Sequence, residues 1–288
     1  MDRKFGKFTV APLGFGAMPL SFKDETDDPS TVIHAALDSG ITLIDTADIY
    51  APSWDQMGHN ERLVAEGIRT YDGDTSRVVV ATKAGITRAE GEQWGRCGTL
   101  SYLRERAEAA RRNLGVEQLD LLYLHRPDRS IRYAESIEAL QQLKADGLVA
   151  EVGISNANVE EIQLALDVLG PGGLAAVQNE FSPWFHHTSK SEMDLCAEVG
   201  VAFVPFSPLG GTGGGAKRLD QRFTSIRKAS EQLGTSAQRV TLAWELSLGS
   251  HVIPIPGASR VASITDSAAA ITDELPSEIL ESISAEVF

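Results

Sequence analysis

Four side chains capable of proton transfer follow three apolar runs of the sequence: Asp45 and Tyr50 follow the same run, Lys83 follows the next, and His125 follows a third. A free tyrosine has a pKa of about 10 and is a weak acid at neutral pH. A lysine ammonium in a poorly solvated pocket can lower that pKa, and a shift of about three units requires about 4 kcal/mol. Asp45 can hold Lys83 charged, and His125 can hydrogen-bond the reacting oxygen. The set predicts proton delivery to an oxygen near neutral pH, and none of the four groups requires a metal.

Each of these groups has a simpler explanation when it is taken alone. Asp45 and Lys83 suit an ordinary buried ion pair. Tyr50 suits a packed loop aromatic, and His125 suits a core histidine bonded to backbone. Only their joint occurrence at the ends of neighbouring strands favours catalysis over these structural roles.

The elements that position these groups repeat along the whole chain, as apolar runs that are each followed by a helical pattern. The predicted strands are APLGFGAM, TLIDTA, VVVATK, LDLLYLH, AEVGIS, AAVQNEF, AFVPFS and HVIPIPG. The predicted helices cover residues 30–40, 60–71, 100–115, 133–147, 159–170, 192–200, 237–249 and 264–270. Eight βα units in 288 residues predict an α/β fold, a closed (β/α)8 TIM barrel that forms a single domain over residues 1–288.

Local signals refine these elements. The start, MDRKFGKFTV, predicts a short N-terminal β-hairpin that turns at Gly6 and plugs the bottom of the barrel. Asp28 with Pro29 predicts the beginning of the first helix, and Asn60 predicts the cap of the second, with Glu61 as its first-turn acid. Glycines are expected to end helices at Gly40, Gly115, Gly147, Gly170, Gly200 and Gly234.

Polar residues also mark the later strand ends, where barrels of this kind carry their chemistry. The residues at these positions are Ser155 and Asn156 after the fifth strand, Gln178 on the sixth, Phe206 and Ser207 on the seventh, and Pro256 and Gly257 on the eighth.

A set of short motifs occurs at these strand ends in a fixed order: DTADIY with GHNERLVAEGI, ATKAG, YLHRPD, VGISN, QNEFSP, PFSPLG and IPIPGASR. With these motifs the chain resembles the aldo-keto reductase family over essentially its whole length. The resemblance implies hydride transfer from a reduced nicotinamide to an aldehyde or ketone, with Tyr50 as the proton donor. Lys83 would tune Tyr50, Asp45 would orient Lys83, and His125 would position the carbonyl. Asp48, between Asp45 and Tyr50, is expected to be solvated.

No G-x-G-x-x-G fingerprint follows any predicted strand, so the sequence pattern alone does not predict a dinucleotide site. The family resemblance implies one. Residues that would hold the nicotinamide are the carboxamide partners Ser155, Asn156 and Gln178 and the stacking aromatic Phe206. The segment SPLGGTGGG, with Ser207, Leu209 and Gly210, would cover the pyrophosphate through backbone N–H groups. A flexible loop is an equally good interpretation of its glycines.

The adenosine end is expected near Gly257 and Arg260. A charge-assisted bond from Arg260 to a 2′-phosphate is worth roughly 1.5–3 kcal/mol, which favours NADPH. NADH remains open, because Ser263 stands where many relatives carry an arginine.

Met18, Trp54, Trp94 and Trp184, together with Phe206, are expected to line an apolar substrate pocket, although outer-layer packing also suits the tryptophans. The sequence stops at Phe288 soon after a last predicted helix, so we expect no long C-terminal loop over the pocket. An open pocket of this kind predicts loose selectivity and weak substrate binding.

Composition limits the remaining classes of function. With 26 Lys and Arg against 40 Asp and Glu, the net charge of −14 disfavours nucleic-acid and anionic-membrane partners. The expected partner is a small-molecule carbonyl substrate. Only Cys97 and Cys196 are present, which suits a reducing cytoplasm. The N-terminal apolar stretch is broken too early by Pro12 and Gly14 for a signal peptide or a membrane span. The oligomeric state stays undetermined.

Two other functions fit parts of the pattern. Some aldo-keto reductases act as cofactor-sensing subunits that turn over slowly, and this role would need a partner surface that the sequence does not reveal. A metal-dependent hydrolase could use Asp45 and His125, but it predicts histidines after the first strand, and residues 13–18 contain none. We therefore predict no metal site.

Overall fold

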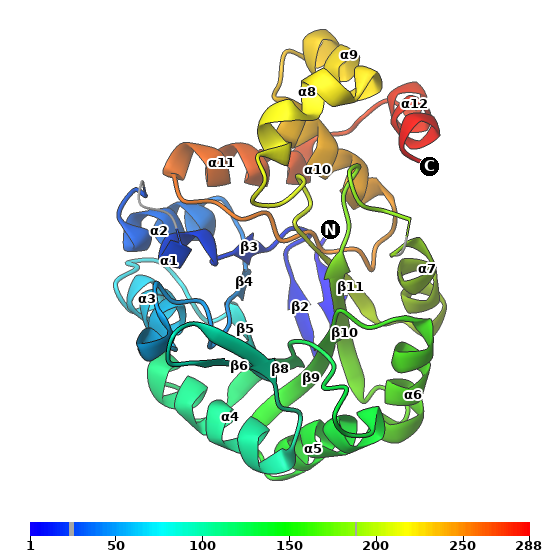
Figure 1. The fold of residues 1–288 in the computed structure, drawn as a ribbon. Coiled ribbons are helices and arrows are strands. Elements are labelled where there is room, and N and C mark those ends of the chain that lie inside the picture. Colours follow the sequence, from blue (N-terminus) through cyan, green and yellow to red (C-terminus); the bar gives the residue numbers. More distant parts are fainter. Residues whose placement is uncertain (23–25, 188) are drawn as a thin grey trace.

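The computed structural model describes residues 1–22, 26–187 and 189–288. Seven parallel strands form one curved sheet, surrounded by helices (Figure 1). The strands follow the order β3 (Phe15–Gly16), β4 (Leu43–Asp45), β5 (Val79–Ala84), β8 (Leu119–Leu124), β9 (Val149–Ser155), β10 (Leu174–Glu180) and β11 (Ala202–Phe206). Consecutive neighbours in this order match consecutive predicted strands, which is the topology of a barrel made of βα units.

The predicted eighth strand, HVIPIPG, closes the barrel without forming a regular ladder. On one side the N–H of Ile253 donates to the carbonyl of Phe203 at 2.8 Å. On the other side the N–H of Gly16 donates to the carbonyl of Pro256 at 3.1 Å. Pro254 and Pro256 have no N–H to donate, so only alternate residues can contribute to the ladder. The (β/α)8 barrel is confirmed, with its last strand reduced to isolated bridges.

Helices cover the outside of the sheet at each predicted position. Their bounds are α2 (Pro29–Asp38), α3 (His59–Arg69), α4 (Leu100–Leu114), α5 (Tyr133–Ala145), α6 (Val159–Leu169), α7 (Lys190–Val199), α10 (Ala237–Ser247) and α11 (Val261–Ala269). A short helix that the sequence did not predict, α1 (Pro19–Phe22), follows β3. Three further helices, α8 (Leu219–Arg222), α9 (Thr224–Leu233) and α12 (Ser277–Val287), lie outside this ring (Figure 1). Short 3-10 turns occur at η1 (Trp54–Gln56), η2 (Gly215–Arg218) and η3 (Ala270–Thr272).

Two antiparallel hairpins complete the part of the chain that the structure describes. The first, β1 (Arg3–Phe5) and β2 (Phe8–Val10), turns at Gly6, whose φ of 60° is readily available to glycine. Phe5 and Val10 are fully buried in one core cluster with the first residues of β4 and β5, so this hairpin fills the amino end of the barrel as predicted. The second hairpin, β6 (Ile86–Ala89) and β7 (Gln93–Arg96), follows the carboxyl end of β5.

Of the two predicted side-chain caps, one is confirmed and one is wrong. Asp28 caps α2 by accepting from the N–H of Thr31, as expected. The prediction that Asn60 caps α3 is wrong, because the helix begins one residue earlier, after a left-handed turn at Gly58. The buried Asn60 amide instead accepts from the Thr46 hydroxyl at 2.7 Å and donates to the carbonyl of Ala17 at 2.9 Å. Asn60 thereby ties the loops after β3 and β4 together.

Within the described ranges, the helices are all too short or too polar to cross a membrane.

Candidate active site

The ammonium of Lys83 lies at the centre of the candidate site, where β4 and β5 end. It forms an ion pair with the carboxylate of Asp45. It also donates to the carbonyl of Thr46 at 2.8 Å and to the hydroxyl of Tyr50 at 3.3 Å. An ammonium has three protons, so each proton has an acceptor here. Because strand ends and one loop supply all the partners, Lys83 has little freedom to move away from Tyr50.

Asp45 is held on both sides. Its second carboxylate oxygen accepts from the side-chain amide of Gln178 on β10 at 2.7 Å. Burial raises the pKa of Asp45, and Lys83 and Gln178 oppose this rise only in part. Burial alone would lower the pKa of Lys83, but the nearby Asp45 and Tyr50 outweigh it and leave that pKa raised. The lysine is therefore kept protonated, as the sequence suggested.

Tyr50 differs from the expectation in one respect. Burial raises the pKa of its phenol, and Lys83 opposes this effect without reversing it, so the net direction is upward. The predicted lowering by Lys83 is thus one contribution to a balance that burial dominates. Below its raised pKa the phenol keeps its proton, so Tyr50 can donate a hydrogen bond or a proton throughout the neutral range.

His125 follows β8, and its ring meets the Tyr50 ring edge to face, with centroids 5.9 Å apart. Burial lowers the pKa of His125 well below its usual value, and the positive charges of Lys83, Arg126 and Arg96 lower it further. The imidazole is therefore neutral at pH 7. Its buried Nδ1 has no hydrogen-bond partner in the part of the chain that the structure describes. A neutral imidazole in this position can hydrogen-bond a carbonyl oxygen next to the phenol.

Ser155 and Asn156 end β9 beside this group. Asn156 adopts a φ of 58°, a left-handed conformation that asparagine tolerates better than most residues. Its side-chain amide donates to the carbonyl of His125 and to the hydroxyl of Ser155, both at 3.0 Å. Its backbone N–H donates to the carbonyl of Gln178 at 3.0 Å, so the ends of β8, β9 and β10 are linked through one residue.

The predicted pyrophosphate segment begins where β11 ends, at the half-buried Phe206. Ser207 has a φ of 54°, and its carbonyl accepts from the N–H of Gly210 at 2.8 Å. Leu209 packs against the core, and Gly210 adopts a φ of 90°. Glycine backbone in these conformations can approach a ligand closely, because no side chain intervenes.

The two residues predicted for the adenosine end lie on another segment. Gly257 pairs with Gly16 in an isolated parallel bridge, and Arg260 is the exposed N-cap residue of α11. The hydroxyl and amide groups at the end of β9, the ring of Phe206, the glycine backbone and this guanidinium are of the chemical kinds that a nicotinamide dinucleotide would need: hydrogen-bonding groups, an aromatic surface and a cation.

The predicted substrate-pocket residues have separate environments. Met18 follows β3 and is half-buried, while Trp54 and Trp94 are 38% and 51% exposed. The Trp184 ring packs edge to face on Phe223 with centroids 5.2 Å apart, and the guanidinium of Arg218 lies 5.5 Å from the Trp184 ring centroid. Phe22, which the sequence did not single out, is 46% exposed, and its ring centroid lies 6.2 Å from that of Tyr50.

Asp48 contradicts the expectation that it is solvated. Its side chain is buried and forms an ion pair of 2.9 Å with Arg106 of α4. Its other oxygen has no partner among the described residues, and burial raises its pKa to about 7. The pattern of the strand end could not reveal this, because the partner is 58 positions away in sequence.

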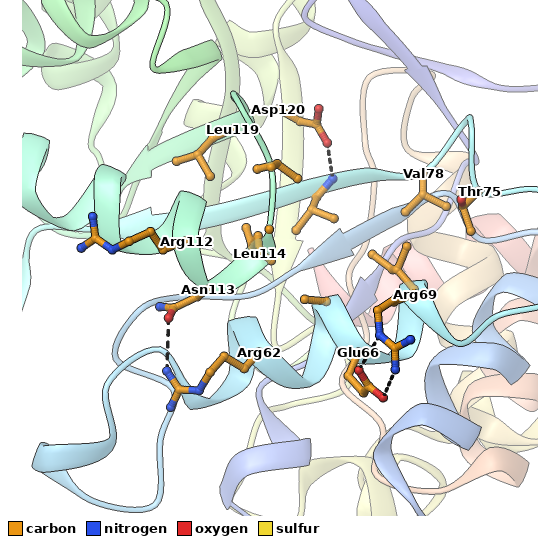
Figure 2. A pocket seen from close by; sticks show the side chains of 15 residues that line it. Arg62, Glu66, Arg69, Thr75, Val78, Arg112, Asn113, Leu114, Leu119 and Asp120 are labelled. Carbon is orange, nitrogen blue, oxygen red and sulfur yellow. Dashed lines mark hydrogen bonds and ion pairs between the residues drawn. The ribbon is translucent and has the colours of Figure 1, made fainter.

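A cavity of about 520 Å³ lies elsewhere, between α3, the end of α4 and the starts of β5 and β8 (Figure 2). Its wall is largely apolar, and Arg62, Arg69 and Arg112 contribute the cations. Arg69 is already bonded to Glu66, and Arg62 to Asn113. The cavity contains none of the residues predicted for catalysis or cofactor binding, so its lining offers no proton-transfer chemistry of the kind described above. Within the described ranges, no cluster of His, Cys, Asp and Glu could hold a metal ion.

Comparison with known proteins shows which family the chain belongs to. A sequence profile of the Aldo/keto reductase family matches residues 12–286. The chain belongs to the aldo-keto reductase family. It is therefore an NAD(P)H-dependent oxidoreductase.

Relatives of this aldo-keto reductase cover nearly the whole chain. A probable aldo-keto reductase of Glycine max is 30% identical over an alignment of 304 positions, which covers 96% of this chain and 85% of that protein. An uncharacterized oxidoreductase of Schizosaccharomyces pombe is 29% identical over 98% of this chain and 89% of that protein.

Solved structures agree with the fold. The glycerol dehydrogenase of Gluconobacter oxydans superposes with a TM-score of 0.83 at 22% identity, over 99% of this chain and 94% of that one. An aldo/keto reductase of Klebsiella pneumoniae, solved in complex with NADP and acetate, gives a TM-score of 0.80 at 25% identity, over 99% and 95% of the two chains.

Proposed function

We propose that this aldo-keto reductase reduces aldehydes or ketones to alcohols, with Tyr50 as the proton donor. The observation that carries the proposal is the Lys83 ammonium, which contacts both the Asp45 carboxylate and the Tyr50 hydroxyl. An ammonium bonded to a phenol stabilises the phenolate that remains after the proton has left. Lys83 therefore assists proton transfer even though the resting phenol has a raised pKa.

The other residues act on the position of the reacting oxygen. Neutral His125, whose ring faces Tyr50, would hydrogen-bond the substrate carbonyl and hold its oxygen near the phenol. Asp45, fixed by Gln178, keeps Lys83 beneath the same hydroxyl. Proton transfer from a positioned side chain typically contributes about 10²–10⁴-fold to a rate.

A reduced nicotinamide, when bound, supplies the hydride. Ser155, Asn156 and Gln178 would hold its carboxamide, Phe206 would stack on the ring, and Ser207, Leu209 and Gly210 would cover the pyrophosphate. The Gln178 side-chain amide donates to Asp45, so cofactor contact by Gln178 would use its remaining hydrogen-bonding capacity.

We propose NADPH as the preferred cofactor, with Arg260 and Gly257 at the adenosine end. The NADP complex of the Klebsiella pneumoniae relative supports this choice. The carboxylate of Asp27 accepts from the N–H of Val261 at 2.8 Å and so lies at the start of α11. Its position there works against a strong preference for NADPH over NADH. This negative charge near the predicted phosphate position leads us to expect a modest preference and usable NADH.

The substrate would be a small carbonyl compound bound among Met18, Trp54, Trp94 and Trp184. We also infer that the protein works as a single domain and in the cytoplasm. Two exposed tryptophans near the Tyr50 loop support an apolar pocket that is open to solvent. We expect weak substrate binding and activity on several carbonyls. A preference of several orders of magnitude for one compound would contradict the open pocket.

The test is NADPH oxidation with a panel of aromatic and aliphatic aldehydes and ketones, comparing wild type with Tyr50→Phe. We expect kcat to fall about 10²–10⁴-fold while NADPH affinity, measured by fluorescence quenching, is unchanged. Tyr71→Phe is the matched control, because the Tyr71 hydroxyl is bonded to Asp38 away from the site. Tight NADPH binding without turnover on any carbonyl would contradict the proposal and favour the sensing role.

A further inference from the structure

Arg88, on β6, has an unusual setting for a guanidinium. Its side chain is only 4% exposed, and it points to the loop that carries Tyr50. One terminal nitrogen donates to the carbonyl of Ala51 at 2.7 Å and to that of Ile49 at 3.2 Å, which are the residues on either side of Tyr50. The other terminal nitrogen donates to the carbonyl of Pro52 at 3.4 Å.

The same guanidinium also binds the hairpin from which it extends. Its Nε donates to Glu92 at 2.6 Å, and a terminal nitrogen donates to the second Glu92 oxygen at 3.1 Å. Glu92 in turn accepts from the backbone N–H of Trp54 at 2.9 Å. The Arg88 guanidinium lies over the ring of Trp94, 4.8 Å from its centroid. The loop after β4 and the β6–β7 hairpin are thus joined at several points through one side chain.

The chemistry of these contacts requires arginine. A guanidinium has five N–H donors in a planar fork, and here the fork serves carbonyls on one side and a carboxylate on the other. A lysine ammonium is a single point with three donors, and it cannot span both sets. The N–H of Tyr50 donates to the carbonyl of Ala47 at 3.2 Å, and the carbonyl of Tyr50 accepts from the N–H of Asn60 at 3.0 Å. Together with the Arg88 contacts, these bonds hold the backbone of the Tyr50 loop in place.

We propose that Arg88 is the positioning residue for Tyr50, and that it fixes the phenol against Lys83 while coupling it to Trp54 and Trp94. The inference deepens the proposed reaction and rests on Tyr50 as its proton donor. Arg88 touches backbone next to the donor and need not touch the substrate. Its effect should therefore fall on kcat, because a displacement of about 1 Å can cost on the order of 100-fold in rate.

The first test compares Arg88→Lys and Arg88→Gln with wild type. We expect kcat to fall about 10- to 100-fold, with NADPH affinity within about two-fold of wild type and a single cooperative thermal transition. Arg69→Lys is the matched control, because Arg69 forms a similar two-point pair with Glu66 but donates to no carbonyl of the Tyr50 loop. An unchanged kcat in both Arg88 variants would overturn the inference.

Chemical rescue separates positioning from general destabilisation. Millimolar guanidinium should restore part of kcat in Arg88→Ala, whereas sodium chloride at equal ionic strength should not. The same guanidinium should leave Tyr50→Phe inactive. Rescue by both salts, or by neither, would contradict a specific role for the guanidinium fork.

Amide hydrogen exchange tests the clamp without any turnover. Arg88→Gln should speed exchange in peptides covering residues 49–54 and leave peptides from α6 unchanged, and uniform or absent changes would refute the contact. If exchange changes as expected but wild type reduces no carbonyl, the proposed reaction fails while the structural inference stands. If wild type is active and exchange does not change, the inference alone fails.

Discussion

Asp45 at the end of β4 and Glu245 on α10 are both removed from solvent, with 3% and 0% of their surfaces exposed. Every oxygen of Asp45 is bonded, one to Lys83 and the other to Gln178. Neither oxygen of Glu245 has a hydrogen-bond partner among the described residues. Burial raises the pKa of Glu245 well above its usual value, so this carboxyl is kept neutral.

The two carboxyl groups therefore differ in their partners: Asp45 is paired with a cation that can take part in chemistry, whereas Glu245 is buried without a partner among the described residues. A buried charge is tolerated when a cation and hydrogen bonds replace its water, and the cation then becomes an active part of the site. A buried carboxyl without partners keeps its proton and carries the cost of desolvation. Asp48 is intermediate, since Arg106 bonds one oxygen and the other has no described partner.

The largest expected effect comes from breaking the Asp45 pair. Lys83→Met removes the ammonium and leaves a buried carboxylate, which should cost about 3–5 kcal/mol in the free energy of unfolding and lower kcat by about 10²–10⁴-fold. Urea unfolding and NADPH oxidation measure the two effects. Asp45→Asn combined with Lys83→Met should recover much of the stability and none of the activity. A single variant with wild-type stability and rate would show that the pair is not the feature that distinguishes Asp45.

The second prediction concerns the unpartnered carboxyl. Glu245→Leu should raise the free energy of unfolding by about 1–3 kcal/mol, because it removes a buried polar group without breaking a hydrogen bond seen in the structure. Activity should not change. A less stable leucine variant at pH 8 would indicate that Glu245 has a partner of its own.

The pH dependence of this effect has a defined sign. The folded-state pKa of Glu245 lies well above the ordinary value of 4.5, so above that pH the folded protein holds a proton that the unfolded chain releases. The stability contributed by this group is therefore lost as pH rises, at about 1.4 kcal/mol per pH unit, up to the folded-state pKa. Glu245→Gln should remove this slope without the full gain of the leucine variant.

The last prediction concerns the pH dependence of stability that comes from Asp48. Its pKa of about 7 lies above the ordinary 3.8, so its contribution to stability is lost between roughly pH 4 and pH 7 and changes little above that range. Asp48→Asn should flatten the stability profile within this window only, because Arg106 can still bond the amide oxygen. Chemical unfolding at pH 5, 6, 7 and 8 measures the slope. A wild-type slope in Asp48→Asn between pH 5 and pH 7 would contradict the assignment.

The sequence supported the barrel well because its signals are local and repeated. Eight apolar runs with intervening helical patterns are enough to predict the order of elements, and glycine cap residues mark several helix ends, as at Gly115 and Gly200. The prediction of a cap at Asn60 was wrong because a polar residue near a helix start has the same local signature whether its side chain caps the helix or bonds a distant loop. Arg88 was missed because its partners on the Tyr50 loop are backbone carbonyls, which leave no mark in the sequence.

By itself the sequence determined which residues end the strands, and therefore which side chains can meet at one face of the barrel. Strand ends of a parallel barrel converge whatever the loops do, so Asp45, Lys83 and His125 were predictable as neighbours. Tertiary structure alone decided how each buried group is balanced: why burial outweighs Lys83 at Tyr50, why Asp48 meets Arg106, and why Glu245 has no described partner. These outcomes depend on solvent access and on contacts between residues far apart in the chain, and both exist only after the barrel has closed.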